Sequence, residues 1–387
     1  MQTSNFSNLE EFLEGWNSNE KYFEMLGLMA RLSKLFSEND VPYLDYRLTE
    51  NLFCKYYNAI NDARSCTAYD ARFSRLGIGI KTFILKNNTS IEKIAEFNKL
   101  RPYLADLKGK ELAYKLAEFR NERMRFADDT FNINESQYHI IGRCSGLLRV
   151  FNVPYERINI DKITHVSDNG PTLSFEDDKN FYTFNRSKTV LMKRFFVPEI
   201  YRDISVDILS DPLTLLEKLL TDKPIEIFKP IVKGYDYVIL PLYSTKQKGE
   251  VPQKSGLNQW NAGGRKRNAN EVYIHVPSQI HLLYPHFFPK RDEPFVLQLP
   301  DGKKLSAKIC QDGGKALMSN PNSDLGEWIL RKILKKKEGS LVTKLDLDTF
   351  GFDSIMVINT HNVNDDGLRI FRLEFAENQD NYQEFIE

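Results

Sequence analysis

Two side chains in the segment YDARFSRLGIGIKTF, Asp70 and Lys81, have the types and the spacing for chemistry on a phosphodiester. The pattern predicts an Asp at the end of one strand, a short turn, and a Lys on the next strand, so that both lie at one pole of a sheet. A carboxylate binds a hard divalent cation such as Mg²⁺ through oxygen. The lysine would orient the attacking water while the metal neutralises charge on the phosphate. On spacing alone, an ordinary amphipathic hairpin with a surface lysine is the simpler interpretation.

This arrangement resembles the core of the PD-(D/E)XK nucleases, as does the wider pattern TENLF…YDA…GIGIKTF…KIAEFN. The resemblance implies a second acid two residues before the lysine, where this chain has Gly79. Some members of that fold supply the missing carboxylate from the following helix, so Glu96 is expected to bind metal together with Asp70. Glu92 is the alternative. Glu50, on the preceding predicted helix, is expected to be an accessory acid.

A second group of candidate functional residues lies in two polar segments of the C-terminal half, SGLNQWNAGGRKRNAN (residues 255–270) and QDGGKALMSNPNSDLGEW (residues 311–328). Arginine pairs with the acceptor edge of guanine, and Asn or Gln pairs with adenine in the major groove. The cations Arg265, Lys266 and Arg267 would serve equally well on phosphates, which fix register without selecting sequence. Each segment taken singly is also explained by a solvated turn, because Asn and Gly favour turns for local reasons.

The strings KSGLNQWNAGGRKRNANEVYIHVP and YPHFFPKRDEPFVLQLPDGKKLSAKICQDGGKALMSNPNSDLGEWIL resemble the C-terminal DNA-binding domain of restriction endonucleases of the NgoFVII/BfiI type. That domain is similar to the plant B-three pseudobarrel. The resemblance covers residues 231–375 and is densest over residues 254–330. It implies an N-terminal arm and a C-terminal arm that contact the major groove. The matching positions are Gln259, Trp260, Asn261, Arg265 and Arg267 in the first arm, and Lys315, Met318, Ser319, Asn320 and Asn322 in the second.

The chain departs from that family in its N-terminal half. The family members carry a phospholipase-D-like nuclease, which needs the pattern H-x-K-x4-D, and none of the six histidines fits it. The sequence also has no P-loop, no GxSxG and no HExxH motif. The absence of a P-loop argues against an ATP-driven restriction motor in this chain. The PD-(D/E)XK pattern is therefore the better candidate for the cleaving part.

The elements that must position these residues divide into an N-terminal mixed part and a C-terminal β-rich part. Apolar spacing predicts helices over residues 8–35, 48–60 (with Thr49 as N-cap), 87–100 and 106–126, and mostly strands over residues 137–196. We expect an α+β protein with a PD-(D/E)XK-like α/β nuclease domain (residues 1–200), a helical linker (residues 201–224) and a β pseudobarrel (residues 225–387). One helix is expected within the pseudobarrel, at LGEWILRKILKKK.

Composition sets the outer limits. The 387 residues include 53 Lys+Arg and 53 Asp+Glu, so the formal net charge is zero and any contact with nucleic acid must use local patches. The four cysteines are scattered, which favours a reducing compartment over a disulfide framework. No apolar run reaches the ~18 residues of a membrane span, and the N-terminal residues do not resemble a secretory signal. The expected location is the cytoplasm.

Together these features predict a Mg²⁺-dependent type II restriction endonuclease that recognises double-stranded DNA through its C-terminal pseudobarrel. Cutting both strands calls for two active sites, so a homodimer is expected. A cognate DNA methyltransferase would be the functional partner. Two alternatives stay open: a DNA-binding regulator without cleavage, favoured by Gly79, and an endonuclease that requires modified DNA.

Overall fold

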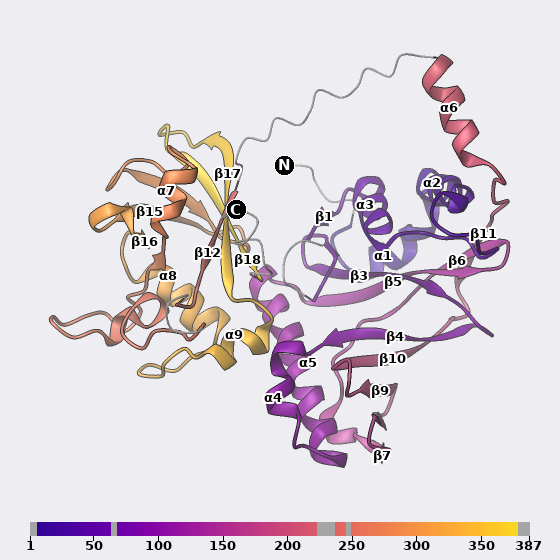
Figure 1. Ribbon diagram of the computed structural model, residues 1–387, viewed down its shortest axis with the longest axis horizontal. Coiled ribbons are helices and arrows are strands. Elements are labelled where there is room, and N and C mark those ends of the chain that lie inside the picture. Colours follow the sequence, from indigo (N-terminus) through magenta and orange to yellow (C-terminus); the bar gives the residue numbers. More distant parts are fainter. Residues whose placement is uncertain (1–5, 63–67, 223–236, 245–248, 378–387) are drawn as a thin grey trace. The chain divides into compact units, whose positions relative to one another are not determined.

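The computed structural model describes residues 6–62, 68–222, 237–244 and 249–377. Contacts divide the chain into two compact units (Figure 1). The N-terminal unit holds residues 1–128 and 133–230, and the C-terminal unit holds residues 129–132 and 231–387. Both units combine helices with sheets, so the fold class is α+β.

A six-stranded sheet forms the centre of the N-terminal unit, in the order β1-β2-β3-β5-β6-β11. Neighbouring strands are antiparallel except β3 and β5, which run parallel. Helices α1, α2 and α3 cover one face (Figure 1). The strand bounds are β1 Ile60–Asn61, β2 Ala71–Arg72, β3 Leu76–Ile84, β5 Glu135–Cys144, β6 Leu147–Pro154 and β11 Tyr201–Ser205.

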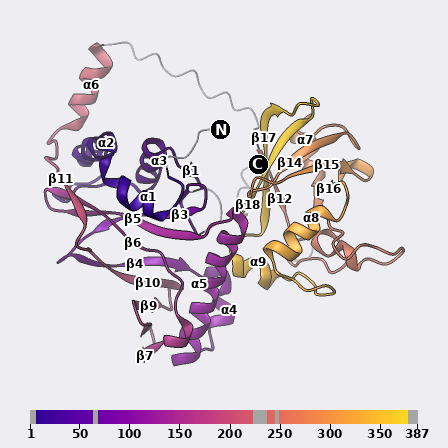
Figure 2. The same cartoon turned by 180° about the vertical axis from the view of Figure 1, so that it is seen from behind.

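A second, five-stranded antiparallel sheet, β4-β10-β9-β8-β7, lies on the opposite side of the first sheet from these helices, as the rear view also shows (Figure 2). Aromatic and aliphatic side chains of this sheet pack with helix α5 into one hydrophobic core. The bounds are β4 Thr89–Glu96, β7 Thr164–Asp168, β8 Thr172–Glu176, β9 Phe181–Asn185, β10 Val190–Phe196, α4 Arg101–Leu104 and α5 Gly109–Phe131.

The three N-terminal helices begin at side-chain caps. Asn8 caps α1 (Leu9–Gly15), Asn19 caps α2 (Glu20–Arg31) and Asp45 caps α3 (Tyr46–Tyr57). The single helix predicted over residues 8–35 is therefore two helices, since Asn19 satisfies free backbone N–H groups in mid-segment. The prediction of Thr49 as a cap was also wrong. Thr49 lies inside α3, and its hydroxyl donates to the carbonyl of Tyr46.

The helix predicted over residues 87–100 was wrong, because residues 89–96 form strand β4. Asn87 and Asn88 have positive φ angles, and Lys86 and Thr89 exchange backbone hydrogen bonds across them. Such a two-residue turn favours a tight hairpin, which forces the following residues into an extended conformation. The predicted helical linker also begins differently, with strand β11 pairing to β6 before α6 (Pro212–Asp222) starts.

The C-terminal unit is built on a seven-stranded sheet that curls into a half-barrel, in the order β12-β17-β18-β14-β15-β16-β13 (Figure 1). Strand β14 runs parallel to β18, and the other pairs are antiparallel. The bounds are β12 Tyr237–Pro241, β13 Ile274–His275, β14 Pro294–Gln298, β15 Lys304–Cys310, β16 Ala316–Ser319, β17 Ser354–Val363, β18 Arg369–Ala376, α7 Ser278–Leu283, α8 Asp324–Gly326, a π-helical segment Glu327–Ile333 and α9 Lys344–Phe350.

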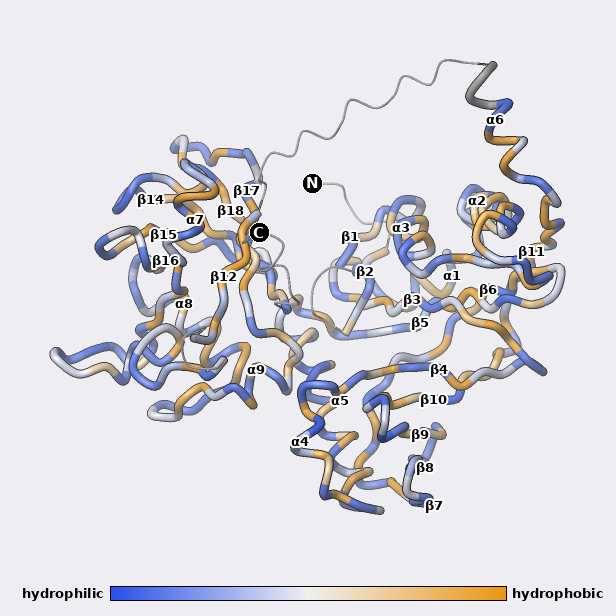
Figure 3. The backbone as a smooth tube through the Cα atoms, viewed as in Figure 1, coloured by the Kyte–Doolittle hydropathy of each residue, from blue (hydrophilic) through white to orange (hydrophobic). Residues whose placement is uncertain are grey.

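The predicted helix of this unit is present as α8 and the π-helical segment, and its Trp328 stacks on Phe375 of β18. Strand β16 and helices α7 and α9 were not predicted. Hydrophobic stretches occur in strands and helices alike, whereas the long loops of the C-terminal unit are largely hydrophilic (Figure 3). Within the described ranges, no helix is long and apolar enough to cross a membrane.

Candidate functional site

The β2–β3 hairpin positions Asp70. The backbone N–H of Asp70 donates to the carbonyl of Ile78 at 3.0 Å. The N–H of Ile80 donates to the Asp70 carboxylate oxygen Oδ2 at 2.7 Å. Burial raises the pKa of Asp70, while the positive charge of the nearby Lys81 opposes that rise. The structure thus places Asp70 and Lys81 close together at the end of the hairpin.

Helix α3 brings Glu50 to the same place. Its carboxylate is buried and pairs with the guanidinium of Arg47 at 3.2 Å. Burial raises the pKa of Glu50 to about 7, and the charge of Asp70 is the next largest cause. Two carboxyl groups that repel each other in this way form a pair that a cation would stabilise.

The two acids of β4 lie at different places along the strand. Glu92 accepts a hydrogen bond from the hydroxyl of Ser90, and burial raises its pKa against the opposing charges of Lys81 and Arg143. Glu96 lies four residues further on, about 13 Å along an extended strand. It pairs with Lys93 at 3.0 Å and accepts a hydrogen bond from Asn98, and the hydrogen bond from Lys93 lowers its pKa.

The structure therefore brings Glu50, Asp70 and Lys81 together, with Glu92 near the lysine. It does not bring Glu96 to this group. Glu96 was predicted to join Asp70 at the metal because a helix was expected over residues 87–100. In the observed strand, Glu96 lies four extended residue steps beyond Glu92, whereas in a helix the two would lie one turn apart.

The position two residues before the lysine has no room for an acid. A Cβ atom on Gly79 would lie 2.8 Å from the ring of Tyr155 and 2.9 Å from the ring of Tyr138. Both tyrosines are buried. Glycine is thus required at this position by packing, and any second acid must come from another element.

Asp70 and Glu50 are the residues that would hold a Mg²⁺ ion. Among the residues the structure describes, no three His, Cys, Asp or Glu side chains are grouped for a metal. Magnesium, however, usually keeps several waters and binds one or two carboxylates together with substrate phosphates. The neighbouring carboxyl groups of Asp70 and Glu50 meet that requirement.

In the C-terminal unit, the two polar segments lie at the ends of adjacent strands. The first segment ends just before β13, which pairs with β16 through Ile274 opposite Leu317. Asn261, Arg265 and Lys266 are exposed, and Gln259 and Trp260 are partly buried. Asn261 also donates to the carbonyl of Gln253 at 3.0 Å, so this exposed side chain already has a partner within the unit.

Arg265 and Arg267 differ in their surroundings, although both pair with the buried carboxylate of Glu271, at 2.6 and 3.4 Å. The side chain of Arg265 is 55% exposed and that of Arg267 only 12%. Arg267 also donates to the backbone carbonyls of Ala262 and Gly263. It therefore holds the loop in shape, which is a different role from the expected contact with DNA.

The second polar segment is divided by β16. Lys315 precedes β16, and its carbonyl accepts a hydrogen bond from the N–H of Val276, which lies just before α7. Asn320 and Asn322 follow β16. Lys315, Asn320 and Asn322 are exposed, and Met318 lies opposite Lys308. Because β13 and β16 are antiparallel, only the two asparagines lie at the strand end nearest the first segment.

Ser319 has a structural role that the resemblance did not imply. It is fully buried, its hydroxyl donates to the carbonyl of Pro321 at 2.8 Å, and it accepts from the N–H of Leu325 at 2.9 Å. The hydroxyl thus fixes the turn that presents Asn320 and Asn322. It is not available to a base edge.

Three residues that sequence reasoning missed hold the first segment in place. Arg331 donates to the side-chain oxygen of Asn270 at 2.8 Å, and a Cβ on Gly326 would lie 1.8 Å from the carbonyl oxygen of Asn270. Buried Asn258 exchanges hydrogen bonds with the backbone of Val342. These contacts are distant in sequence and leave no local pattern.

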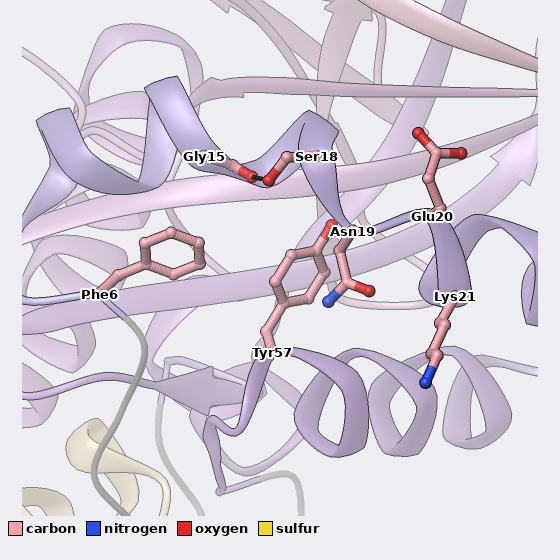
Figure 4. A pocket seen from close by; sticks show the side chains of 7 residues that line it. All are labelled: Phe6, Gly15, Ser18, Asn19, Glu20, Lys21 and Tyr57. Atoms are coloured by element: carbon pink, nitrogen blue, oxygen red, sulfur yellow. Dashed lines mark hydrogen bonds between the residues drawn. The ribbon is translucent and has the colours of Figure 1, made fainter.

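A surface pocket of about 480 Å³ also lies on the N-terminal unit. It is lined by Phe6, Gly15, Ser18, Asn19, Glu20, Lys21 and Tyr57 (Figure 4). None of the acids near Lys81 contributes to it. The pocket is therefore separate from the candidate catalytic group.

Comparison with known families identifies the C-terminal unit. Residues 237–361 match the family model described as the NgoFVII C-terminal B3-like DNA-binding domain. A comparison of the whole chain with curated proteins finds no match. The family match, together with the half-barrel sheet, supports sequence-specific binding of double-stranded DNA by this unit.

Proposed function

We propose that the chain is a type II restriction endonuclease that cleaves double-stranded DNA at a specific sequence with Mg²⁺. The observation that carries the proposal is the match of residues 237–361 to a restriction-enzyme DNA-binding domain in a chain whose other unit groups Asp70, Lys81 and Glu50. In a restriction enzyme, a domain of this kind recognises the DNA and another part of the protein cleaves it.

Each residue of the group has a defined part. Asp70 and Glu50 would hold Mg²⁺, which when bound neutralises charge on the scissile phosphate and the leaving oxygen. Lys81 orients the attacking water. Glu92, near Lys81, accepts the proton that the attacking water releases.

The assembly follows from the reaction. Cleavage of both strands calls for two active sites, and a homodimer provides them. The host DNA would be protected by a cognate methyltransferase that modifies the same sequence.

The experiment is digestion of plasmid DNA by the purified full-length chain. With Mg²⁺ we expect discrete fragments, and we expect none with a chelator or with the Asp70→Ala and Lys81→Ala variants. Plasmid that stays uncut under every divalent metal, with intact duplex binding, would instead favour a non-cleaving regulator. Gly79, which stands where the nuclease pattern has an acid, is the feature that favours that second candidate.

Modified plasmid separates the type II assignment from a modification-dependent one. We expect methylation at the target to protect the DNA. Cleavage restricted to modified plasmid would overturn the type II assignment and leave the cleaving residues unchanged.

A further inference from the structure

A stacked pair of buried tyrosines connects the two central residues of the proposed site. The rings of Tyr138 (β5) and Tyr155, which follows β6, lie 3.9 Å apart and 11° from parallel. The hydroxyl of Tyr155 donates to the carbonyl of Ala68 at 2.8 Å, two residues before Asp70. Tyr155 thus anchors the backbone that presents the carboxylate.

The other ring of the pair reaches the lysine. The ammonium nitrogen of Lys81 lies 5.7 Å from the centre of the Tyr138 ring, within range of a cation–π interaction. The same ring lies 5.9 Å from the ammonium of buried Lys193 on β10. An aromatic face that attracts the Lys81 ammonium restricts where this flexible side chain lies.

The stack also occupies the space above Gly79, where a Cβ atom would collide with both rings. Two tyrosine rings thus fill the space that the nuclease pattern reserves for an acidic side chain. An acid there would bind metal and interact with the lysine. In this chain the rings lie beside that lysine, and one of them is hydrogen-bonded to the segment that carries Asp70.

We propose that the Tyr138–Tyr155 pair positions Asp70 and Lys81 relative to each other, in place of the side chain that Gly79 lacks. The inference rests on the proposed function, because the geometry it maintains is that of the cleavage site. Both tyrosines are positioning residues and neither touches the DNA. Misplacement of a reacting group by about 1 Å can cost 10²-fold in rate, so their effect falls on catalysis.

The test uses the full-length chain and single-turnover cleavage. Tyr138→Phe keeps the ring and is expected to cut within about 3-fold of the native rate, whereas Tyr138→Leu loses the stack and falls by about 10²-fold. Tyr155→Phe loses only the hydrogen bond to Ala68 and falls by about 10-fold. Duplex affinity is expected to stay unchanged in all three.

Tyr182→Phe is the matched control, since Tyr182 is also buried and its hydroxyl bonds to Asp177, outside the pair. Equal losses in Tyr182→Phe and Tyr155→Phe would overturn the proposal, as would native cleavage by Tyr155→Phe. Should Tyr138→Leu fail to fold, the Tyr155→Phe comparison still decides.

Hydrogen exchange gives a readout that does not need cleavage. The Ile80 amide donates to Asp70, so loosening of the anchored segment exposes it. We expect faster exchange at Ile80 in Tyr155→Phe and native exchange in Tyr182→Phe. Native exchange at Ile80 in Tyr155→Phe would contradict the inference. If the native chain does not cut DNA, the proposed function fails, and this measurement still tests the pair.

Discussion

At the scale of single residues, the structure separates exposed side chains, which DNA can reach, from buried side chains that hold a loop. Arg265 and Arg267 are two residues apart, yet only Arg265 is largely exposed. The sequence predicted both as DNA contacts because it shows charge and spacing. It does not show that Glu271 and two backbone carbonyls already engage Arg267.

Arg265→Ala and Lys315→Ala are expected to weaken duplex binding while leaving the fold intact. Loss of one phosphate contact reduces the slope of log affinity against log salt by about 1, and loss of a base contact costs about 1–3 kcal/mol. Titration of labelled duplex at several salt concentrations measures both. Native affinity for either variant would count against DNA contact by the two polar segments.

Arg267→Ala is expected to behave differently, because Glu271 is left buried with only one partner. The free energy of unfolding falls by about 1–3 kcal/mol. Thermal unfolding of the C-terminal unit measures this loss, with Lys266→Ala as the control. A melting temperature equal to the native value would show that Arg267 does not hold the loop.

The two acids of β4 give a matched pair for the cleavage site. Glu92→Gln is expected to lower the cleavage rate by about 10²-fold, since Glu92 lies near Lys81. Glu96→Gln is expected to cut at the native rate, because Glu96 is engaged by Lys93 and Asn98. The reverse order of rates would restore Glu96 as the second acid of the site.

At the scale of elements, the local patterns predicted much of the structure. The strand–turn–strand that carries Asp70 and Lys81 was predicted, although its turn lies at residues 73–75 and the glycines expected in the turn lie inside β3. The helix predicted over residues 106–126 corresponds to α5, which spans residues 109–131. Strand β4 was predicted to be a helix because its polar residues also suit a helix. The turn at Asn87–Asn88 starts a hairpin instead, so the residues that follow it are extended. The Tyr138–Tyr155 stack depends on strand register, which no local pattern encodes.

Helix α2 and strand β5 meet at a buried histidine that links stability to pH. His139 lies between the hydroxyl of Tyr22 at 2.9 Å and the side-chain oxygen of Asn152 at 2.8 Å, and burial lowers the pKa of His139 to about 4. Between about pH 6.5 and pH 4 the unfolded chain binds a proton that the folded chain does not. Stability is therefore lost as pH falls through this range, by at most about 3 kcal/mol.

Glu50 acts in the opposite direction, because its raised pKa near 7 stabilises the folded chain at lower pH. The change of the native chain's stability with pH is therefore the difference between the His139 and Glu50 contributions. A variant of one residue isolates that residue's contribution. Denaturant unfolding of His139→Gln between pH 4 and 7 is expected to show lower stability and to lack the histidine contribution. A difference from the native chain that does not vary with pH would show that His139 is not neutral in the fold.

At the scale of the whole molecule, the division of labour between the two units is the central proposal. The family match covers only residues 237–361, so DNA binding is supported directly and cleavage rests on the group around Lys81. Sequence resemblance predicted the C-terminal unit well because long strings match. The N-terminal unit was harder to predict, since its site depends on residues from α3, β3 and β4 that meet only in the folded chain.

The homodimer is a prediction at the same scale. Light scattering of the chain with and without target duplex is expected to show a dimer at least when DNA is bound. Full double-strand cleavage by a protein that stays monomeric on its target would contradict it.

The most direct measurement is sequencing of the DNA ends that the native chain produces from genomic DNA lacking the cognate modification, with Mg²⁺ present. The account predicts that the ends share one short recurring sequence, and that Asp70→Ala yields no ends while still binding duplexes that contain this sequence. Ends without a shared sequence, or the same ends from Asp70→Ala, would contradict it.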